Sequence, residues 1–91
     1  MATWKQTLDI TDLMETFEQT EDALTFAKRA STRILLFIEN YQSWSDRIGV
    51  TEDLEQIAEG LSDADDKEEI DYLLADLYDL ADNARIWVKT F

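Results

Sequence analysis

The chain of 91 residues has no cysteine, no histidine and no proline, and only two glycines. The absence of cysteine excludes disulfides and thiolate metal sites, and it leaves the cytoplasm as the default compartment. The absence of histidine excludes Ser-His-Asp and Cys-His catalysis and histidine metal sites. The isolated glycines, Gly49 and Gly60, exclude a glycine-rich phosphate loop. The sequence therefore predicts a protein that is not an enzyme and that uses no cofactor and no metal.

Long apolar runs are also missing from the chain. The longest covers residues 34–38, far less than the about 20 residues of a membrane span. The first residues are polar and charged where a signal peptide needs an apolar stretch. With 45% apolar residues the composition is that of a globular chain, and the length suits one core. We therefore predict a single domain over residues 1–91 that is cytoplasmic and does not contact membranes.

With so few turn-forming residues, the chain favours long helices. Apolar residues at helical spacing predict four of them, at residues 11–18, 21–44, 51–61 and from residue 65 towards the C-terminus. Side chains suited to capping stand at or near their starts: Asp12, Thr20, Thr51 and Asp65. Between the second and third helices, residues 45–50 are predicted to form a break in which Gly49 adopts the left-handed conformation.

The apolar stripes predict how these helices pack. The second helix is apolar on two faces, which places it at the centre, and its main stripe comprises Leu24, Ala27, Ser31, Ile34, Ile38 and Tyr41. The third helix is expected to bury Leu54, Ile57, Ala58 and Leu61. The fourth carries the strongest pattern, in which apolar residues recur at alternating intervals of three and four: Ile70, Leu73, Leu77, Leu80, Ala84, Trp87 and Phe91. Its inward face is expected to include Leu74 as well. The predicted fold class is all-α, a small four-helix bundle-like single domain.

The two ends of the chain allow an alternative. Residues 4–10 and 85–91 are rich in aromatic and β-branched side chains, which favour strands. The alternative fold is therefore α+β, with the two chain ends paired as a short antiparallel ribbon that lies on the helices.

The same ends carry a resemblance. The segments WKQTLDI at residues 4–10 and ADNARIWV at residues 81–88 resemble the ends of small acidic proteins found in phages and mobile elements. These proteins are mostly without assigned function. The resemblance implies an accessory protein that targets a host component, and it carries over no functional residue.

Negative charge is the most prominent property of the second half of the chain. Residues 51–82 contain thirteen carboxylates and one base, Lys67, and so hold twelve of the thirteen net negative charges. Helices that are merely solvated usually mix signs at neighbouring positions, whereas here the repulsion is left uncompensated. Nucleic acids and anionic membranes are excluded as direct partners because both are polyanions. The charge predicts a field directed at a basic protein surface.

The predicted partner-binding residues lie on the outer sides of the third and fourth helices: Glu68, Glu69, Tyr72, Asp76, Asp79, Glu52, Asp53, Glu55 and Glu59. Regularly spaced carboxylates on a rigid helix are comparable with the phosphates of a nucleic acid. The predicted function is an acidic inhibitor that occupies a basic, nucleic-acid-binding surface of a host protein, of the anti-CRISPR or anti-restriction type. The alternatives are an antitoxin or immunity protein that neutralises a basic toxin, and a structural module that forms a homodimer through the fourth helix.

The bases and the tryptophans suggest structural roles. The cluster of Lys28, Arg29 and Arg33 on the second helix is predicted to pair with the acidic third or fourth helix. The alternative is that the cluster forms a binding patch of its own. The three tryptophans, Trp4, Trp44 and Trp87, are expected to anchor the core or an interface because aromatic rings of this size are rarely left fully exposed.

Overall fold

The computed structural model describes residues 2–84 and 87–88, and its elements are helices with one pair of very short strands. In chain order the elements are β1 (Ala2–Thr3), α1 (Trp4–Thr7), α2 (Ile10–Gln19), α3 (Ala23–Asn40), α4 (Gln42–Ile48), α5 (Thr51–Asp63), α6 (Lys67–Asn83) and β2 (Trp87–Val88). The predicted all-α fold class is confirmed, and the terminal strands are a minor addition to it.

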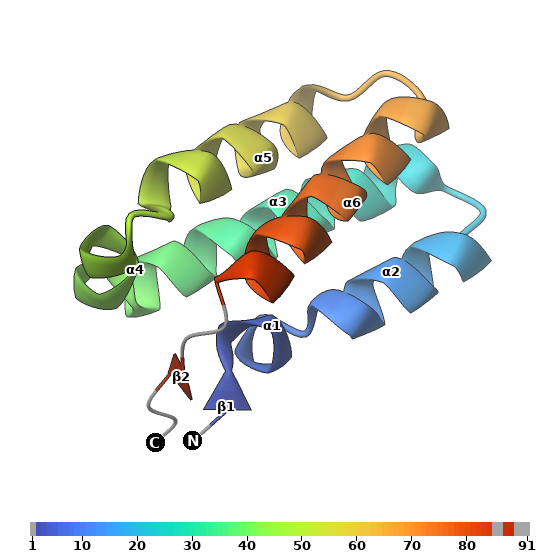
Figure 1. The fold of residues 1–91 in the computed structure, drawn as a ribbon. Helices are drawn as coiled ribbons and strands as arrows, with labels where there is room; N and C mark the ends of the chain where they lie inside the picture. Colours follow the sequence, from blue (N-terminus) through green and yellow to red (C-terminus); the bar gives the residue numbers. More distant parts are fainter. Residues whose placement is uncertain (1, 85–86, 89–91) are drawn as a thin grey trace.

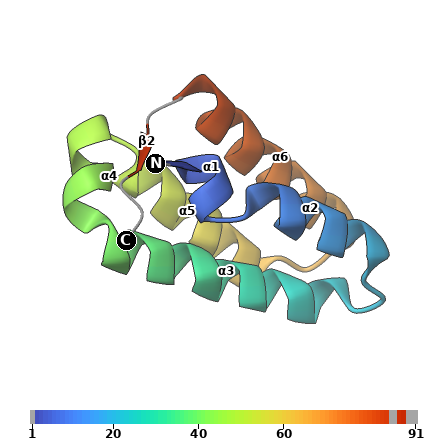
Figure 2. The same ribbon diagram turned by 90° about the horizontal axis from the view of Figure 1, so that it is seen from below.

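The four long helices α2, α3, α5 and α6 run along the longest dimension of the molecule, and each runs antiparallel to the one before it (Figure 1). The body measures 34 × 22 × 21 Å. Helix α3 packs against α2, α4, α5 and α6, so the second predicted helix is central, as expected. Seen from below, α2 lies between α6 and α3 (Figure 2). Helix α5 packs against α6 as well as α3, so the two acidic helices α5 and α6 are direct neighbours.

The predicted inward faces are largely correct. All four expected residues of α5 are buried: Leu54, Ile57, Ala58 and Leu61. On α6, Ile70, Leu74 and Leu77 are buried, whereas Leu73 and Leu80 are half-buried beside α5. On α3 the prediction for Leu24 is wrong because this side chain is 45% exposed. The buried face of α3 is centred on Ala27 and Ile34, and Leu24 lies at its edge in the first turn.

Small side chains bring α3 and α5 together. Ala27 and Ala30 of α3 and Ala58 of α5 are completely buried. The hydroxyl of Ser31 donates a hydrogen bond of 2.6 Å to the backbone carbonyl of Ala58 on the neighbouring helix. The hydrogen bond compensates for the loss of water around the buried hydroxyl. Ser31 therefore joins the two helices without weakening the core.

The helix starts differ from the sequence prediction at α2 and α5. Helix α2 begins at Ile10 and not near Asp12, because Asp9 turns the chain with a left-handed φ of 58°. Helix α5 includes Thr51 as its first residue, so Thr51 is not the N-cap. Its hydroxyl instead donates to the carboxylate of Asp46 at 2.6 Å.

Helices α3 and α6 are capped by aspartates that the prediction missed. At α3 the cap is Asp22 and not Thr20, because its carboxylate accepts from the hydroxyl of Thr25 at 2.6 Å and from the Thr25 backbone amide at 3.1 Å. These two hydrogen bonds lower the pKa of Asp22, the hydroxyl contributing most. At α6 the cap is Asp66 and not Asp65, since the amide of Glu69 donates to Asp66 at 2.8 Å.

The cap of α6 makes a testable prediction. Replacing Asp66 by alanine should lower the free energy of unfolding by about 1 kcal/mol, because the backbone amide of Glu69 loses its acceptor. Replacing the adjacent Asp65 removes the same charge without touching the cap and serves as the matched control. Urea denaturation measures both. Equal losses in the two variants would contradict the assignment of the cap.

The predicted break at residues 45–50 is mostly helical. Helix α4 covers Gln42–Ile48, and the chain departs from helical geometry earlier, at Tyr41. This short helix places Trp44 against Trp4 and Phe37, with ring centroids 6.2 and 6.0 Å apart. Tertiary packing of aromatic rings therefore outweighs the weak local signal. The prediction for Gly49 is confirmed, since its φ is 79°.

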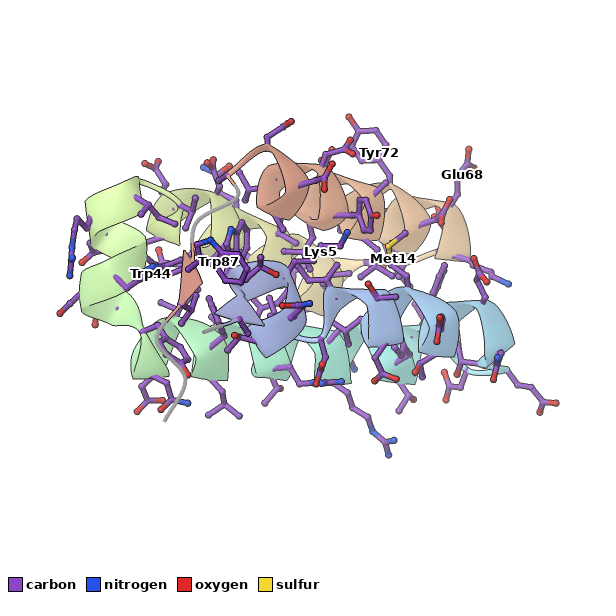
Figure 3. All side chains as sticks on the ribbon, turned by 60° about the horizontal axis from the view of Figure 1, so that its bottom comes forward. Lys5, Met14, Trp44, Glu68, Tyr72 and Trp87 are labelled. Carbon is purple, nitrogen blue, oxygen red and sulfur yellow. The ribbon has the colours of Figure 1, made fainter. Side chains whose placement is uncertain are left out.

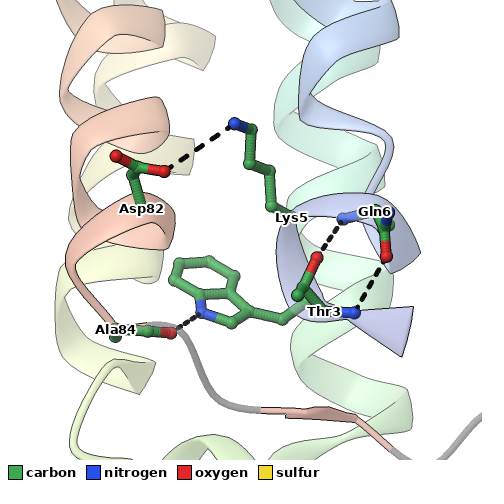
Figure 4. A network of polar contacts seen from close by, with 6 residues as sticks. Thr3, Lys5, Gln6, Asp82 and Ala84 are labelled. Carbon is green, nitrogen blue, oxygen red and sulfur yellow. Dashed lines mark hydrogen bonds and ion pairs between the residues drawn. The ribbon is translucent and has the colours of Figure 1, made fainter. Parts of the chain in front are cut away.

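The antiparallel ribbon of the chain ends, predicted as the alternative fold, is found but is shorter than predicted. Ala2 pairs with Val88 and Thr3 with Trp87 in an antiparallel ribbon. The predicted N-terminal strand is otherwise wrong, because Trp4–Thr7 is helical. Thr3 and Gln6 form a reciprocal capping box, with bonds of 3.4 and 3.1 Å (Figure 4), which starts a helix immediately after the strand. Most of the predicted C-terminal strand, at residues 85–86 and 89–91, lies outside the described residues.

The end of α6 differs from the predicted stripe. The helix ends at Asn83, so Trp87 belongs to β2 and is 58% exposed, while Phe91 lies outside the described residues. Within the helix, Ile70, Leu74, Leu77 and Ala81 are buried in the bundle, whereas Leu73 and Leu80 are half-buried against it. The homodimer through the fourth helix stays a prediction. It was expected because a stripe that continues to Trp87 and Phe91 is longer than a small bundle covers, and among the described residues α6 does not extend that far.

The N-terminal residues Trp4 and Lys5 contact the C-terminal part of α6 and the residue after it. Trp4 is completely buried, and its indole N–H donates to the carbonyl of Ala84 at 2.7 Å (Figure 4). The ammonium of Lys5 lies 3.7 Å above the ring of Tyr78 and 3.9 Å from a carboxylate oxygen of Asp82. These contacts hold α6 in place from the side opposite to α5.

Candidate functional site

All nine predicted partner-binding residues are exposed. On α6, Glu68, Tyr72, Asp76 and Asp79 follow one another at intervals of four, four and three residues, which places them along one side of the helix. We call these four residues the outer stripe of α6. Figure 3 shows Glu68 and Tyr72 projecting away from the body of the molecule. The predicted exposure of this side is therefore confirmed, whereas its role in binding remains a prediction.

A groove lies between α5 and α6. Its lining consists of Asp53, Gln56, Ile57, Leu73, Asp76 and Leu80, and its volume is about 450 Å³. Asp53 comes from α5 and Asp76 from α6, so the structure brings two of the predicted site residues to the same groove. The apolar part is formed by the buried Ile57 and the half-buried Leu73 and Leu80. We call this the acidic groove.

Gly60 sets the distance between the two helices beside this groove. A Cβ atom at this position would lie 3.1 Å from both δ carbons of Leu73, which is closer than ordinary van der Waals contact. A glycine inside a helix costs about 1 kcal/mol relative to alanine. That cost is offset here by the room that the missing side chain leaves for Leu73.

The remaining carboxylates of α5 do not all join the acidic groove. Glu52 and Glu55 line a second hollow of about 460 Å³ together with Asp46, Gly49 and Thr51. Sequence reasoning missed Asp46, which α4 and the turn at Gly49 bring to this place. Asp46 could have been predicted at this hollow only if residues 42–48 had been recognised as a helix.

The predicted pairing of the basic cluster with the acidic helices is wrong. Arg33 contacts Asp9 at 3.5 Å and Asp12 at 3.7 Å, both at the start of α2. Lys28 and Arg29 are exposed on α3. Arg33 lies on the side of α3 that faces the start of α2. The bases that were expected to neutralise α5 and α6 therefore lie elsewhere.

The charge of α5 and α6 is thus left largely uncompensated. The two helices carry eleven carboxylates and one base, Lys67. Among the described residues, Lys5 forms an ion pair with Asp82 of α6, whereas the two ion pairs of Arg33 go to Asp9 and Asp12 and involve neither helix. Lys67 lies 5.7 Å from the centre of the Phe17 ring. A preorganised surface of one sign is the result, and it generates a field of the kind that steers charged partners.

The two tyrosines of α6 have different environments. Tyr72 is 69% exposed in the outer stripe, whereas Tyr78 is half-buried beneath Lys5. An exposed aromatic ring among carboxylates offers flat contact area with a hydroxyl that can form hydrogen bonds, as is common at protein interfaces. Tyr72 therefore fits a partner-binding role, and Tyr78 a structural one.

Residues 2–84 and 87–88 contain neither of two other kinds of functional feature, a metal site or a membrane-spanning helix. No cluster of three or more carboxylates there is arranged to hold a metal ion. None of the helices in that part of the chain has the length and apolar character needed to cross a membrane.

The repulsion among these carboxylates predicts how stability responds to salt. Raising the ionic strength from about 0.01 M to about 0.15 M shortens the Debye length from about 30 to about 8 Å, which screens charges that only the compact state holds together. We expect the melting temperature to rise, and about 1 kcal/mol of relief would raise it by about 4–8 °C in a chain of this size. Calorimetry in sodium chloride measures the effect. A melting temperature indifferent to salt would show that the carboxylates are spaced widely enough not to repel.

Comparisons with protein-family models, with curated proteins and with solved structures found no match to this chain. The resemblance of the chain ends to small acidic phage and mobile-element proteins therefore stays a prediction. A helical bundle is compatible with many functions, so function must be argued from the surface that the bundle presents.

Proposed function

We propose that this protein is a stoichiometric inhibitor that binds a basic, nucleic-acid-binding surface of a target protein. The observation that supports it is the composition of α5 and α6, which together carry eleven carboxylates and one lysine. A surface of this composition is self-repulsive in the compact state, and among the described residues the bundle uses few of these carboxylates, such as Asp82 beside Lys5, in ion pairs. A positively charged partner turns this repulsion into attraction.

The helical framework suits the carboxylates to this task. Residues four apart on a helix are separated by about 6 Å along the axis, the same order as the about 3.4 Å axial spacing of phosphates on one nucleic-acid strand. Helices α5 and α6 are held in one orientation by buried leucines and isoleucines, so their charges are preorganised before binding. Basic grooves of nucleic-acid-binding proteins recognise this kind of charge array, and an anti-CRISPR or anti-restriction protein is the concrete instance that we propose.

The test is capture of the partner followed by a competition assay. The immobilised protein is exposed to a bacterial lysate, and bound proteins are eluted with rising salt and identified. We expect a basic protein that elutes as the salt rises, because contacts to exposed charges are screened. Its binding to labelled nucleic acid, followed by fluorescence anisotropy, should be lost when one copy of this chain is added per binding site.

Three results of this test would contradict the proposal. A partner that resists high salt but is released by a mild detergent would indicate an apolar interface. A partner that binds the chain and nucleic acid at the same time would show that the two do not compete for one surface. A basic partner with no affinity for nucleic acid would instead favour the neutralisation of a toxin.

A further inference from the structure

The acidic groove contains a feature that electrostatic attraction alone does not require. Ile57, Leu73 and Leu80 form an apolar strip within the most acidic surface of the molecule. Leu73 and Leu80 are half-buried although they lie at core-facing spacing on α6. A surface that acted only through charge would gain nothing from an open apolar groove at this place.

We infer that the acidic groove receives the apolar side chains of a basic amphipathic helix of the partner, with the basic side chains of that helix meeting the carboxylates at its edges. This inference rests on the proposed function and specifies its partner further. The expected interface is then not purely electrostatic. It has an apolar centre and a charged rim, as specific protein interfaces usually do.

The dimensions of the groove fit such an occupant. Leu73, Asp76 and Leu80 are spaced by three and four residues and extend over about 10 Å of α6. Two turns of a partner helix present apolar side chains at the matching spacing, which is how amphipathic helices occupy hydrophobic grooves.

The charges select the partner. Asp53 and Asp76 stand on different helices at the groove, and the outer stripe of α6 continues the negative charge beyond it. A second copy of this chain would set like charges against one another at the same contact, which disfavours it as the occupant. A helix with lysine or arginine beside its apolar stripe would instead pair with both walls of the groove.

Three synthetic helical peptides test the inference. The first carries leucines along one stripe with lysines on both sides, the second has glutamines in place of the leucines, and the third has glutamates in place of the lysines. Affinities are measured by fluorescence anisotropy, and the site is mapped by amide chemical shifts of the nitrogen-15-labelled protein. We expect the first peptide to bind at least about tenfold more tightly than the second, the effect of burying about one leucine side chain. We expect no binding of the third.

Matched variants of the protein locate the contact. Leu73→Gln should weaken the first peptide about tenfold, to the level of the second peptide. Leu35→Gln changes a leucine that is 50% exposed on α3, away from the groove, and should leave binding unchanged. Circular dichroism confirms that both variants are folded. The chemical shifts should change most at Asp53, Gln56, Ile57, Leu73, Asp76 and Leu80.

Several outcomes would overturn the inference. Equal affinity for the first and second peptides would show that charge alone acts, and it would leave the proposed inhibitor function standing. Chemical shifts that change on α3, or the absence of binding by any peptide, would also reject the groove as the site. Self-association of the chain that is lost in Leu73→Gln would make a second copy the occupant. The proposed function fails separately, through the competition assay with nucleic acid.

Discussion

Reversing Glu68, Glu69, Asp76 and Asp79 to lysine should abolish partner binding, with a loss of affinity of at least about a hundredfold. The four substitutions change the net charge of α6 by eight units and place lysines where the proposed partner has its own bases. Like charges across an interface cost several kcal/mol, whereas about 2.7 kcal/mol already corresponds to a hundredfold. Surface plasmon resonance with the captured partner measures both the affinity and the association rate. For the unaltered chain that rate should fall steeply with added salt.

The control must separate the local surface from the total charge. Reversal of Glu15, Glu18, Glu21 and Glu39 changes the net charge by the same amount, and these residues are exposed on α2, α3 and the loop between them. We expect this variant to retain most of the affinity. Glu68 and Glu69 lie in the first turn of α6, where acids stabilise the helix by about 0.3–1 kcal/mol each, so the first variant loses this stabilisation while it relieves repulsion among the carboxylates of α6.

Binding that survives the reversals on α6 would contradict the electrostatic interpretation. If affinity were lost instead on changing Trp44 or the exposed Trp87, the interface would be apolar and would lie near the chain ends. Equal losses in the two charge variants would mean that net charge matters and that the surface of α5 and α6 has no special part.

Replacing Trp4 by alanine should lower the free energy of unfolding by about 3–5 kcal/mol. Trp4 is completely buried, and its ring lies 6.3 Å from that of Phe37 and 6.2 Å from that of Trp44. The substitution also removes the hydrogen bond to the carbonyl of Ala84. Because domains of this size are stable by only about 5–15 kcal/mol, we expect the variant to be partly unfolded at moderate temperature. Denaturation in urea, followed by circular dichroism, measures the loss.

Trp4→Phe separates packing from hydrogen bonding. Phenylalanine keeps most of the aromatic contact with Phe37 and Trp44 but has no N–H, so the carbonyl of Ala84 is left without this donor. We expect a loss of about 1–3 kcal/mol, clearly smaller than that of the alanine variant. A loss below about 1 kcal/mol for Trp4→Ala would mean that the N-terminus contributes little to the fold, contrary to its burial.

The inward faces of α5 and α6 were predictable because they depend on local periodicity. Leu54, Ile57, Ala58 and Leu61 are buried as their spacing indicates, and the polar residues between them are exposed. The helix starts were less predictable. Asp65 and Asp66 each have a glutamate three residues later, so both fit the spacing of a capping box. Only the path of the chain into α6 places the carboxylate of Asp66 within reach of the backbone amide of Glu69.

The candidate site was predictable as a surface but not as a groove. A helical projection was sufficient to predict that the outer stripe of α6 is exposed, because the exposure of a residue follows from its position around its own helix. That Asp53 and Asp76 line the same groove depends on how α5 and α6 approach each other, and the lack of a side chain at Gly60 leaves room there for Leu73. The separation of Glu52 and Glu55 into a second hollow depends in the same way on the position of α4.

By itself, the sequence determined the helical class, the exclusion of cysteine and histidine chemistry and the concentration of negative charge in residues 51–82. These properties follow from composition and from interactions between residues close in the chain. Only the tertiary structure decided which charges find partners. It directs Arg33 to Asp9 and Asp12, and Lys5 to Asp82, because these partners are brought together by packing between residues far apart in the sequence.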